Sequence, residues 1–138
     1  MPEVGARASR ELVVTPELVR AYAEITGDYN PLHFDEEFVA ATRFGRLMAQ
    51  GGIATGLLHA LVAMDLPGPG SVFSRQRWSF PRPVYIGDTI RAEGTVLSAN
   101  TRRRFYEMAF IVTNQAEETV LEGEATVYQA ERRSNAEV

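Results

Sequence analysis

Residues 51–64 read GGIATGLLHALVAM, and this stretch decides the fold of the chain. Only Thr55 and His59 interrupt a segment that otherwise consists of glycine and apolar residues. A helix that is apolar on every side is typical of a buried helix, because none of its faces suits water. The segment is too short to cross a bilayer, which takes about 20 residues. It therefore predicts a central helix that the rest of the chain covers.

The residues that follow this helix predict a run of strands. Residues 66–70 read LPGPG, which is typical of the end of a helix. Four later segments are rich in β-branched and aromatic residues and are separated by turn-forming sequences, namely residues 72–80, 89–99, 103–113 and 119–129. Consecutive strands after helices indicate an α+β fold, in which an antiparallel β-sheet covers the apolar helix.

The residues before the central helix predict a strand and a first helix. Residues 11–14, ELVV, favour a short strand. Thr15 followed by Pro16 is typical of a helix start, because the hydroxyl can cap a free N–H and proline suits the first helical position. Gly27 is placed to end this helix.

A proline separates that helix from a second, shorter one. Asn30 precedes Pro31, so it avoids the helical conformation, and we expect a non-helical loop there. Leu32 and Phe34 alternate with His33, which predicts that they pack on the core while His33 points the other way. Asp35 is typical of the N-cap of a helix over residues 36–42.

Composition limits the classes of function. With 138 residues, of which 45% are hydrophobic and 23% charged, the chain suits a single domain, which we place at residues 1–130, with a disordered tail at 131–138. A net charge of -4 and a pI near 5.2 argue against nucleic-acid or membrane partners. The absence of cysteine excludes disulfides and thiolate chemistry. The N-terminus lacks the apolar run of a signal peptide, so we expect a cytoplasmic protein.

The spacing of residues excludes three common ligand-binding motifs. The segment GGIATG is followed by Leu57, where a phosphate-binding P-loop requires lysine. Residues 28–39 resemble a calcium loop, but His33 and Val39 occupy the positions that need glycine and glutamate. Two histidines without H-x-x-x-H spacing do not suit zinc, so we expect no metal site.

Asp28 and His33 are the candidate catalytic pair, within the segment GDYNPLHFD, residues 27–35. On a structural interpretation, Asp28 only caps a turn and His33 is an ordinary loop histidine. On a catalytic interpretation, both face one cleft and share a water molecule, with the carboxylate as base and the imidazole orienting the water. Asn30 then holds the loop or the substrate.

The start of the central helix offers a partner for such a base. Gly51 and Gly52 have no side chains, so the free N–H groups of the first turn can approach a carbonyl oxygen, as in an oxyanion hole. Alternatively, the glycines of this helix only permit tight packing against the sheet.

Two long stretches carry a resemblance to a known family. Residues 22–58, YAEITGDYNPLHFDEEFVAATRFGRLMAQGGIATGLL, and residues 66–90, LPGPGSVFSRQRWSFPRPVYIGDTI, resemble the MaoC-like dehydratases, the (R)-specific enoyl-CoA hydratases of hotdog fold. The signature D-x-N-P-L-H occurs together with the P-V-x-x-G-D turn at residues 83–88. The resemblance implies a long helix wrapped by an antiparallel sheet, a homodimer or higher oligomer formed through the sheets, and an active site near the dimer interface.

The resemblance also implies a reaction. Asp28 and His33 match the catalytic pair, Asn30 a supporting residue, and the backbone N–H of Gly51 the oxyanion donor. Water adds reversibly to a trans-2-enoyl thioester and gives the (R)-3-hydroxyacyl thioester. The implied partner is an acyl-CoA or an acyl-carrier-protein thioester, and no metal or organic cofactor is needed.

Two positions depart from the family pattern. The family usually has histidine immediately before the helix glycine, where this chain has Gln50, which can donate a hydrogen bond but cannot titrate. His59 lies eight residues after Gly51, near the same helix face. It is either a core histidine bonded to a backbone carbonyl, or it reaches toward Asp28 or narrows the acyl pocket.

Arginines are the candidates for holding the phosphates of the carrier. Arg75, Arg77, Arg82 and the run at residues 102–104 could bind coenzyme A or phosphopantetheine, although arginines at strand ends also form ordinary solvated surface. Gly52 is a further candidate beside the thioester. Two alternatives to a hydratase stay open: a hotdog thioesterase and a non-catalytic acyl-thioester binding module.

Overall fold

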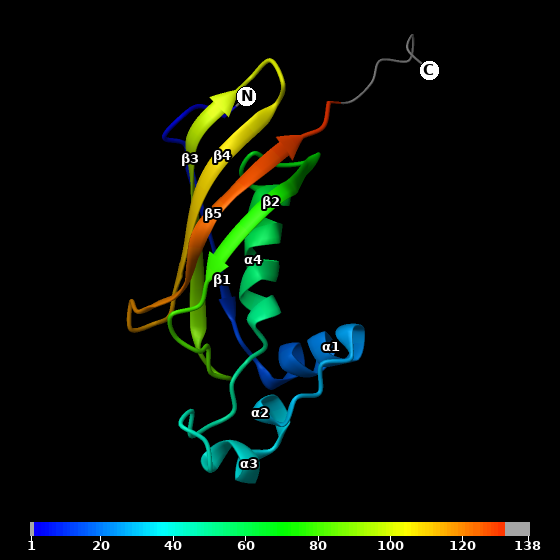
Figure 1. Ribbon diagram of the computed structural model, residues 1–138, viewed down its shortest axis with the longest axis vertical. Helices are drawn as coiled ribbons and strands as arrows, with labels where there is room; N and C mark the ends of the chain where they lie inside the picture. Colours follow the sequence, from blue (N-terminus) through cyan, green and yellow to red (C-terminus); the bar gives the residue numbers. More distant parts are fainter. Residues whose placement is uncertain (1, 132–138) are drawn as a thin grey trace.

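The computed structural model describes residues 2–131, in which one antiparallel sheet curves around a long helix (Figure 1). The elements in chain order are β1 (Arg7–Val13), α1 (Pro16–Thr26), α2 (Pro31–Phe34), α3 (Glu36–Ala40), α4 (Gly51–Met64), β2 (Ser71–Ser79), β3 (Thr89–Asn100), β4 (Phe105–Thr113) and β5 (Thr119–Gln129). The predicted order of helices and strands is confirmed except for the additional short helix α2, and β1 begins four residues before the predicted strand.

The sheet has the strand order β1-β3-β4-β5-β2, and all neighbouring strands are antiparallel. The helix α4 lies inside its curve and contacts β1, β2 and β3. This is the predicted α+β hotdog architecture. Strands β1 and β2 are the two edges of the sheet.

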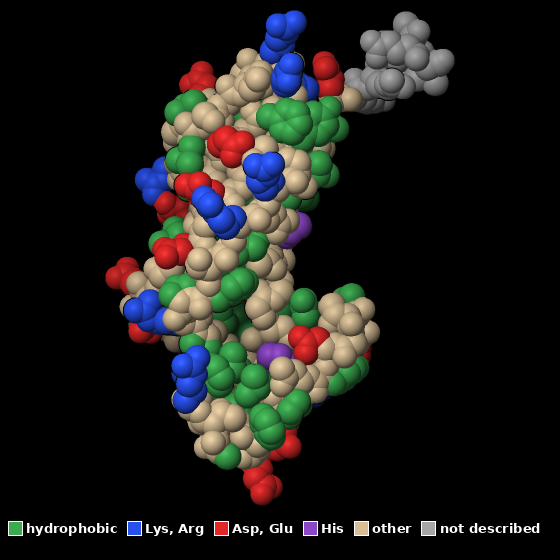
Figure 2. Space-filling view, in the orientation of Figure 1, with side chains coloured by type: hydrophobic (Ala, Val, Ile, Leu, Met, Phe, Trp, Pro, Cys, Tyr) green, Lys and Arg blue, Asp and Glu red, His purple; other side chains and the backbone are tan. Residues whose placement is uncertain are grey.

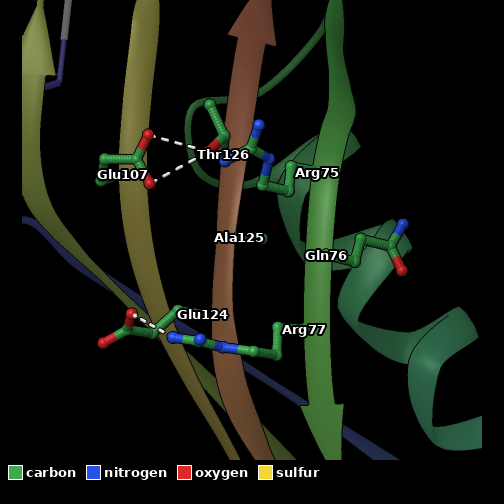
Figure 3. Close-up of a pocket in the computed structure, with 7 residues that line it drawn as sticks. All are labelled: Arg75, Gln76, Arg77, Glu107, Glu124, Ala125 and Thr126. Atoms are coloured by element: carbon green, nitrogen blue, oxygen red, sulfur yellow. Dashed lines mark hydrogen bonds and ion pairs between the residues drawn. The ribbon is translucent and has the colours of Figure 1, made fainter.

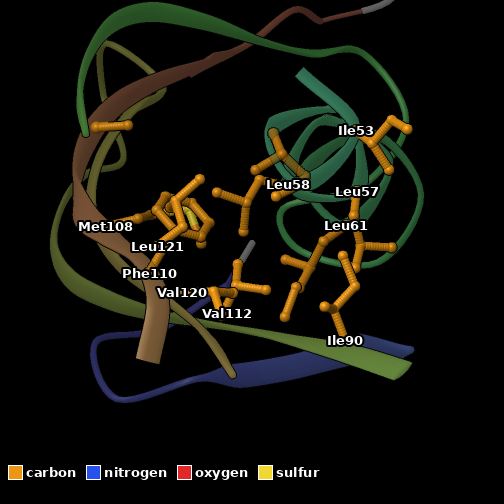
Figure 4. Close-up of a cluster of buried hydrophobic side chains, with 14 of the residues drawn as sticks. Ile53, Leu57, Leu58, Leu61, Ile90, Met108, Phe110, Val112, Val120 and Leu121 are labelled. Atoms are coloured by element: carbon orange, nitrogen blue, oxygen red, sulfur yellow. The ribbon is translucent and has the colours of Figure 1, made fainter. Parts of the chain in front are cut away.

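The core forms where α4 meets the inner face of the sheet. Leu58 and Leu61 are fully buried and point toward buried side chains of the strands, among them Met108, Val112 and Leu121 (Figure 4). Each such side chain contributes about 1.5–3 kcal/mol of transfer free energy. The core therefore fixes which face of α4 meets the sheet.

The other face of α4 is open, so the prediction of a helix buried on all sides is wrong for this single chain. Gly51, Gly56, His59 and Met64 are exposed. The sheet curves around the helix from one side only, and hydrophobicity alone could not show which side stays uncovered.

Helices α1 to α3, which we call the platform (residues 16–40), lie at one end of the sheet, below the start of α4 in Figure 1. The predicted caps are confirmed. The hydroxyl of Thr15 accepts a hydrogen bond from the N–H of Leu18, and Gly27 ends α1 with φ of 83°. Asp35 caps α3 by accepting from the N–H of Phe38.

The expectation of a non-helical loop after Asn30 is wrong. Proline excludes only the residue before it from the helix, and Pro31 itself becomes the first residue of α2. Asn30 is the N-cap, and its side-chain oxygen accepts from the N–H of Leu32.

The tail predicted at residues 131–138 lies, apart from its first residue, outside the described residues. Within residues 2–131, no helix has both the length and the apolar character needed to cross a bilayer.

Candidate active site

Asp28 follows α1 directly, and its two carboxylate oxygens have different surroundings. Oδ1 accepts a hydrogen bond from the backbone N–H of Asn30 (3.3 Å), which is the turn-capping role. Oδ2 faces the imidazole of His33, at 3.8 Å from Nε2. The structural and the catalytic interpretations of Asp28 are therefore compatible, because one oxygen serves each.

His33 is held by a backbone carbonyl. Its Nδ1 lies 2.6 Å from the carbonyl oxygen of Met48, and a carbonyl can only accept, so Nδ1 carries a proton. In the neutral ring, Nε2 then has a free lone pair directed to Asp28. Sequence offered no signal for Met48, because it acts through its backbone.

The predicted orientation of the His33 segment is wrong. His33 is buried at 6% exposure, whereas the side chain of Phe34 is 39% exposed. Alternation of faces belongs to an extended chain, but this segment is the helical turn α2, in which successive side chains are about 100° apart.

The separation of Asp28 and His33 suits one water molecule. At 3.8 Å the two atoms are too far apart for a direct hydrogen bond. A water that donates to two acceptors at about 2.8 Å each holds them about 4.4 Å apart, so a shift of about half an ångström admits it. Its two protons then point at Oδ2 and Nε2, and an oxygen lone pair remains free to attack.

The first turn of α4 supplies hydrogen-bond donors. The N–H groups of Gly51 and Gly52 have no intrahelical acceptor, and the N-cap Gln50 makes no side-chain capping bond. A methyl group at Gly51 would lie 3.4 Å from the Phe80 ring, so that ring covers one side of the helix start. The helix dipole adds partial positive charge here.

An apolar cavity of about 300 Å³ adjoins this turn. Gly51 and Ala54 of α4 line it together with Met48, Phe80 and Val84. Met48 thus links the cavity to His33. In Figure 2 this face of the molecule is hollowed between the platform and the body formed by the sheet and α4.

Gln50 is buried beside these donors. It is 3% exposed, and its amide nitrogen donates to the carbonyl of Val19 in α1 (3.0 Å). Its Oε1 has no hydrogen-bond partner in residues 2–131. Gln50 therefore ties the platform to the start of α4, and Asn30, which caps α2, stiffens the platform from within.

His59 is neither a core histidine nor close to the platform. It is exposed on α4, its Nε2 lies 3.3 Å from the amide nitrogen of Gln76 on β2, and its ring contacts Phe73. The indole N–H of Trp78 donates a hydrogen bond to Oε1 of the same Gln76 side chain (2.7 Å). His59 thus marks the open face of α4.

The candidate arginines separate into three places. Arg82 lines the cavity beside Gly51, where its guanidinium also donates to the carbonyl of Thr119. Arg75 and Arg77 lie on β2 and extend over the outer face of the sheet, away from α4, as Figure 3 shows. Residues 102–104 form the β3–β4 turn, at the opposite end of the sheet from the platform (Figure 1).

The chain is similar to known proteins over most of its length. The family model described as MaoC like domain matches residues 2–120. A 3-hydroxybutyryl-CoA dehydratase of Methylorubrum extorquens is 38% identical over 91% of this chain and 79% of its own length. An (R)-specific enoyl-CoA hydratase of Aeromonas caviae is 33% identical over 91% of this chain and 93% of its own.

A further relative and a solved structure are also similar to this chain. A mitochondrial 3-hydroxyacyl-[acyl-carrier-protein] dehydratase of Arabidopsis thaliana is 31% identical over 90% of this chain and 75% of its own. The solved structure titled (R)-hydratase from A. caviae involved in PHA biosynthesis superposes with a TM-score of 0.88, at 32% identity, over 94% of this chain and 98% of that one.

Proposed function

The chain belongs to the MaoC-like domain family, and we propose that Asp28 and His33 hold the water molecule with which it acts. The enzyme is a hydratase or dehydratase that adds water reversibly to an enoyl thioester and gives the (R)-3-hydroxyacyl thioester. The gap of 3.8 Å between Oδ2 and Nε2 is the observation that supports this role.

The first step is attack by the bound water. Oδ2 of Asp28 takes one water proton, and Nε2 of His33 accepts a hydrogen bond from the other, which fixes the oxygen lone pair toward the β-carbon. The new C–O bond forms as the C2=C3 electron pair moves toward the thioester oxygen. General base assistance of this kind contributes about 10²–10⁴ in rate.

In the second step the enolate is protonated at the α-carbon. Its oxygen lies at the start of α4, where the Gly51 N–H donates to it, and such a donor is worth about 10²–10³ in rate. The Asp28 carboxyl then returns its proton to the α-carbon and the enolate collapses to the thioester. Because one carboxyl takes and returns the proton, both groups add to the same face.

We further propose that the reaction uses no metal or organic cofactor. Base, orienting group and oxyanion donor are all supplied by Asp28, His33 and Gly51. The carrier is coenzyme A or an acyl carrier protein, and Arg82 is the candidate of the arginine set that lies on the cavity beside Gly51. Asn30 and Gln50 support the geometry of the site, and Gly52 provides the second free N–H.

We also propose a homodimer. The open face of α4 and the edge strand β2 lie side by side, and they expose Met64 and Val72 at 62% and 56%. An edge strand with unpaired backbone groups can pair with a second copy. Packing of two such faces would cover the apolar helix that a single sheet leaves open.

The testing experiment follows the absorbance of the enoyl-thioester chromophore with crotonyl-CoA. The wild-type enzyme should lower this absorbance as it hydrates the double bond. Asp28→Asn, which is nearly isosteric, should lower kcat by at least about 100-fold. Binding of crotonyl-CoA to Asp28→Asn, measured by calorimetry, should stay within a few-fold of the KM of wild type. Full activity in Asp28→Asn would contradict the water site.

Two alternatives give different results in the same assay. A thioesterase would release free thiol, which a thiol reagent detects, without forming the 3-hydroxyacyl product. A binding module would bind crotonyl-CoA and leave both absorbance and thiol unchanged. Either result with wild type would overturn the proposed function.

A further inference from the structure

The hydroxyl group of Tyr22 lies against the start of α4. A methyl group at Gly52 would be 1.8 Å from the Tyr22 oxygen and 2.4 Å from Cζ, so the tyrosine tip occupies the space of the missing side chain. Tyr22 lies in α1, three residues after the buried Val19. The ring does pack on the core, but its polar end reaches the backbone of another helix.

This hydroxyl has no hydrogen-bond partner in the described part of the chain. Tyr22 is half-buried, and its hydroxyl keeps access to solvent, so leaving it without a protein partner carries little cost in stability. The hydroxyl is therefore placed where only a ligand or solvent can satisfy it.

A second polar group at the same helix end is also unsatisfied. Oε1 of Gln50 is buried and unpaired, and the Gln50 amide is fixed to Val19, one turn of α1 before Tyr22. Buried polar groups in folded proteins normally have partners. Oε1 of Gln50 can only accept a hydrogen bond, so the groups at this helix end that can donate to a ligand oxygen are the Gly51 and Gly52 N–H groups and the Tyr22 hydroxyl.

Two rings approach the helix start at neighbouring residues. Phe80 lies against Gly51 and the Tyr22 hydroxyl lies against Gly52, whose N–H groups have no intrahelical acceptor. We propose that the Tyr22 hydroxyl donates a second hydrogen bond to the thioester oxygen that Gly51 holds. The proposal rests on the proposed function and makes Tyr22 a catalytic residue.

The kinetic test removes one oxygen atom. Tyr22→Phe should lower kcat for crotonyl-CoA about 10- to 100-fold, because it deletes one donor to a developing oxyanion. KM should change less than about three-fold and the melting temperature by less than about 2 °C. The matched control is Tyr128→Phe on β5, whose ring contacts Phe105 and which should keep wild-type kcat. Wild-type kcat in Tyr22→Phe would overturn the proposal and leave the proposed function standing.

A spectroscopic test works without turnover. In the Asp28→Asn background, infrared difference spectra with crotonyl-CoA carrying ¹³C at the thioester carbonyl report the stretch of the bound C=O. Donors at the oxygen should lower this frequency, and adding Tyr22→Phe should move it part of the way back to the value in solution. An equal frequency with and without the Tyr22 hydroxyl would reject the proposal. If binding does not lower the frequency at all, the thioester oxygen does not lie at this helix end, and both the oxyanion role of Gly51 and the proposal fail.

Discussion

Oδ2 of Asp28 and Nε2 of His33 lie 3.8 Å apart, with Asp28 in the loop between α1 and α2 and His33 within α2. The carboxylate is 41% exposed and the imidazole 7%, so the pair stands at the boundary between solvent and core. Water reaches the carboxylate, while the histidine is kept in one orientation by the Met48 carbonyl. The pair is thus both accessible and rigid.

His33→Ala should damage activity and stability together. It removes the group proposed to orient the water, so we expect kcat to fall by at least about 100-fold. It also takes away the hydrogen-bond donor of the Met48 carbonyl and should lower the free energy of unfolding by about 1–3 kcal/mol. Urea denaturation and the crotonyl-CoA assay measure the two effects. Activity equal to wild type would remove His33 from the mechanism.

Alanine substitutions at the two glycines should differ. At Gly51 the new methyl group meets the Phe80 ring at an ordinary 3.4 Å, so stability should change by less than about 1 kcal/mol. At Gly52 it meets the Tyr22 hydroxyl at 1.8 Å, and displacing that ring should cost about 1–3 kcal/mol. Thermal unfolding measures the stability of the Gly51→Ala and Gly52→Ala variants. Equal stabilities would show that Tyr22 is not packed on Gly52.

Arg82→Gln should weaken binding of the carrier, whereas Arg75→Gln should not. Arg82 lies on the cavity beside Gly51, and Arg75 lies on the outer face of the sheet. Loss of one charge-assisted contact to phosphate, worth about 1.5–3 kcal/mol when fully formed, should raise KM for crotonyl-CoA about ten-fold or more. Steady-state kinetics with both variants measure this. A rise with Arg75→Gln alone would move the carrier site to the outer face.

The dimer can be tested at Gly56. Gly56 is exposed, and a Cβ added there meets no other atom within 4 Å in the single chain, so Gly56→Arg should leave the subunit folded. It would, however, place a charge on the open face of α4 and should shift the sedimentation coefficient from dimer to monomer. Gly56→Ala is the control and should remain dimeric. A dimer in Gly56→Arg would mean that this face is not the interface.

The platform shows how far local sequence rules reach. Thr15, Gly27 and Asp35 each set a helix end through their own side chain or conformation, so their roles follow from two or three neighbouring residues. The same rules gave the wrong structure at Pro31. A proline is compatible both with a loop and with the first position of a helix, and nothing local decides between them.

The sequence by itself determined the α+β class, the apolar helix, the order of the strands along the chain and the choice of Asp28 and His33 as the candidate pair. These follow from periodicity, capping residues and a specific signature, all of which act within short segments. Tertiary structure alone decided which face of α4 stays open, that Met48 orients His33 through its carbonyl, and that Arg82 lies on the cavity while Arg75 and Arg77 do not. It also brought the Tyr22 hydroxyl to Gly52, 30 residues further along the chain. Such contacts join distant segments, and they depend on how the sheet curves around the helix, which no local pattern encodes.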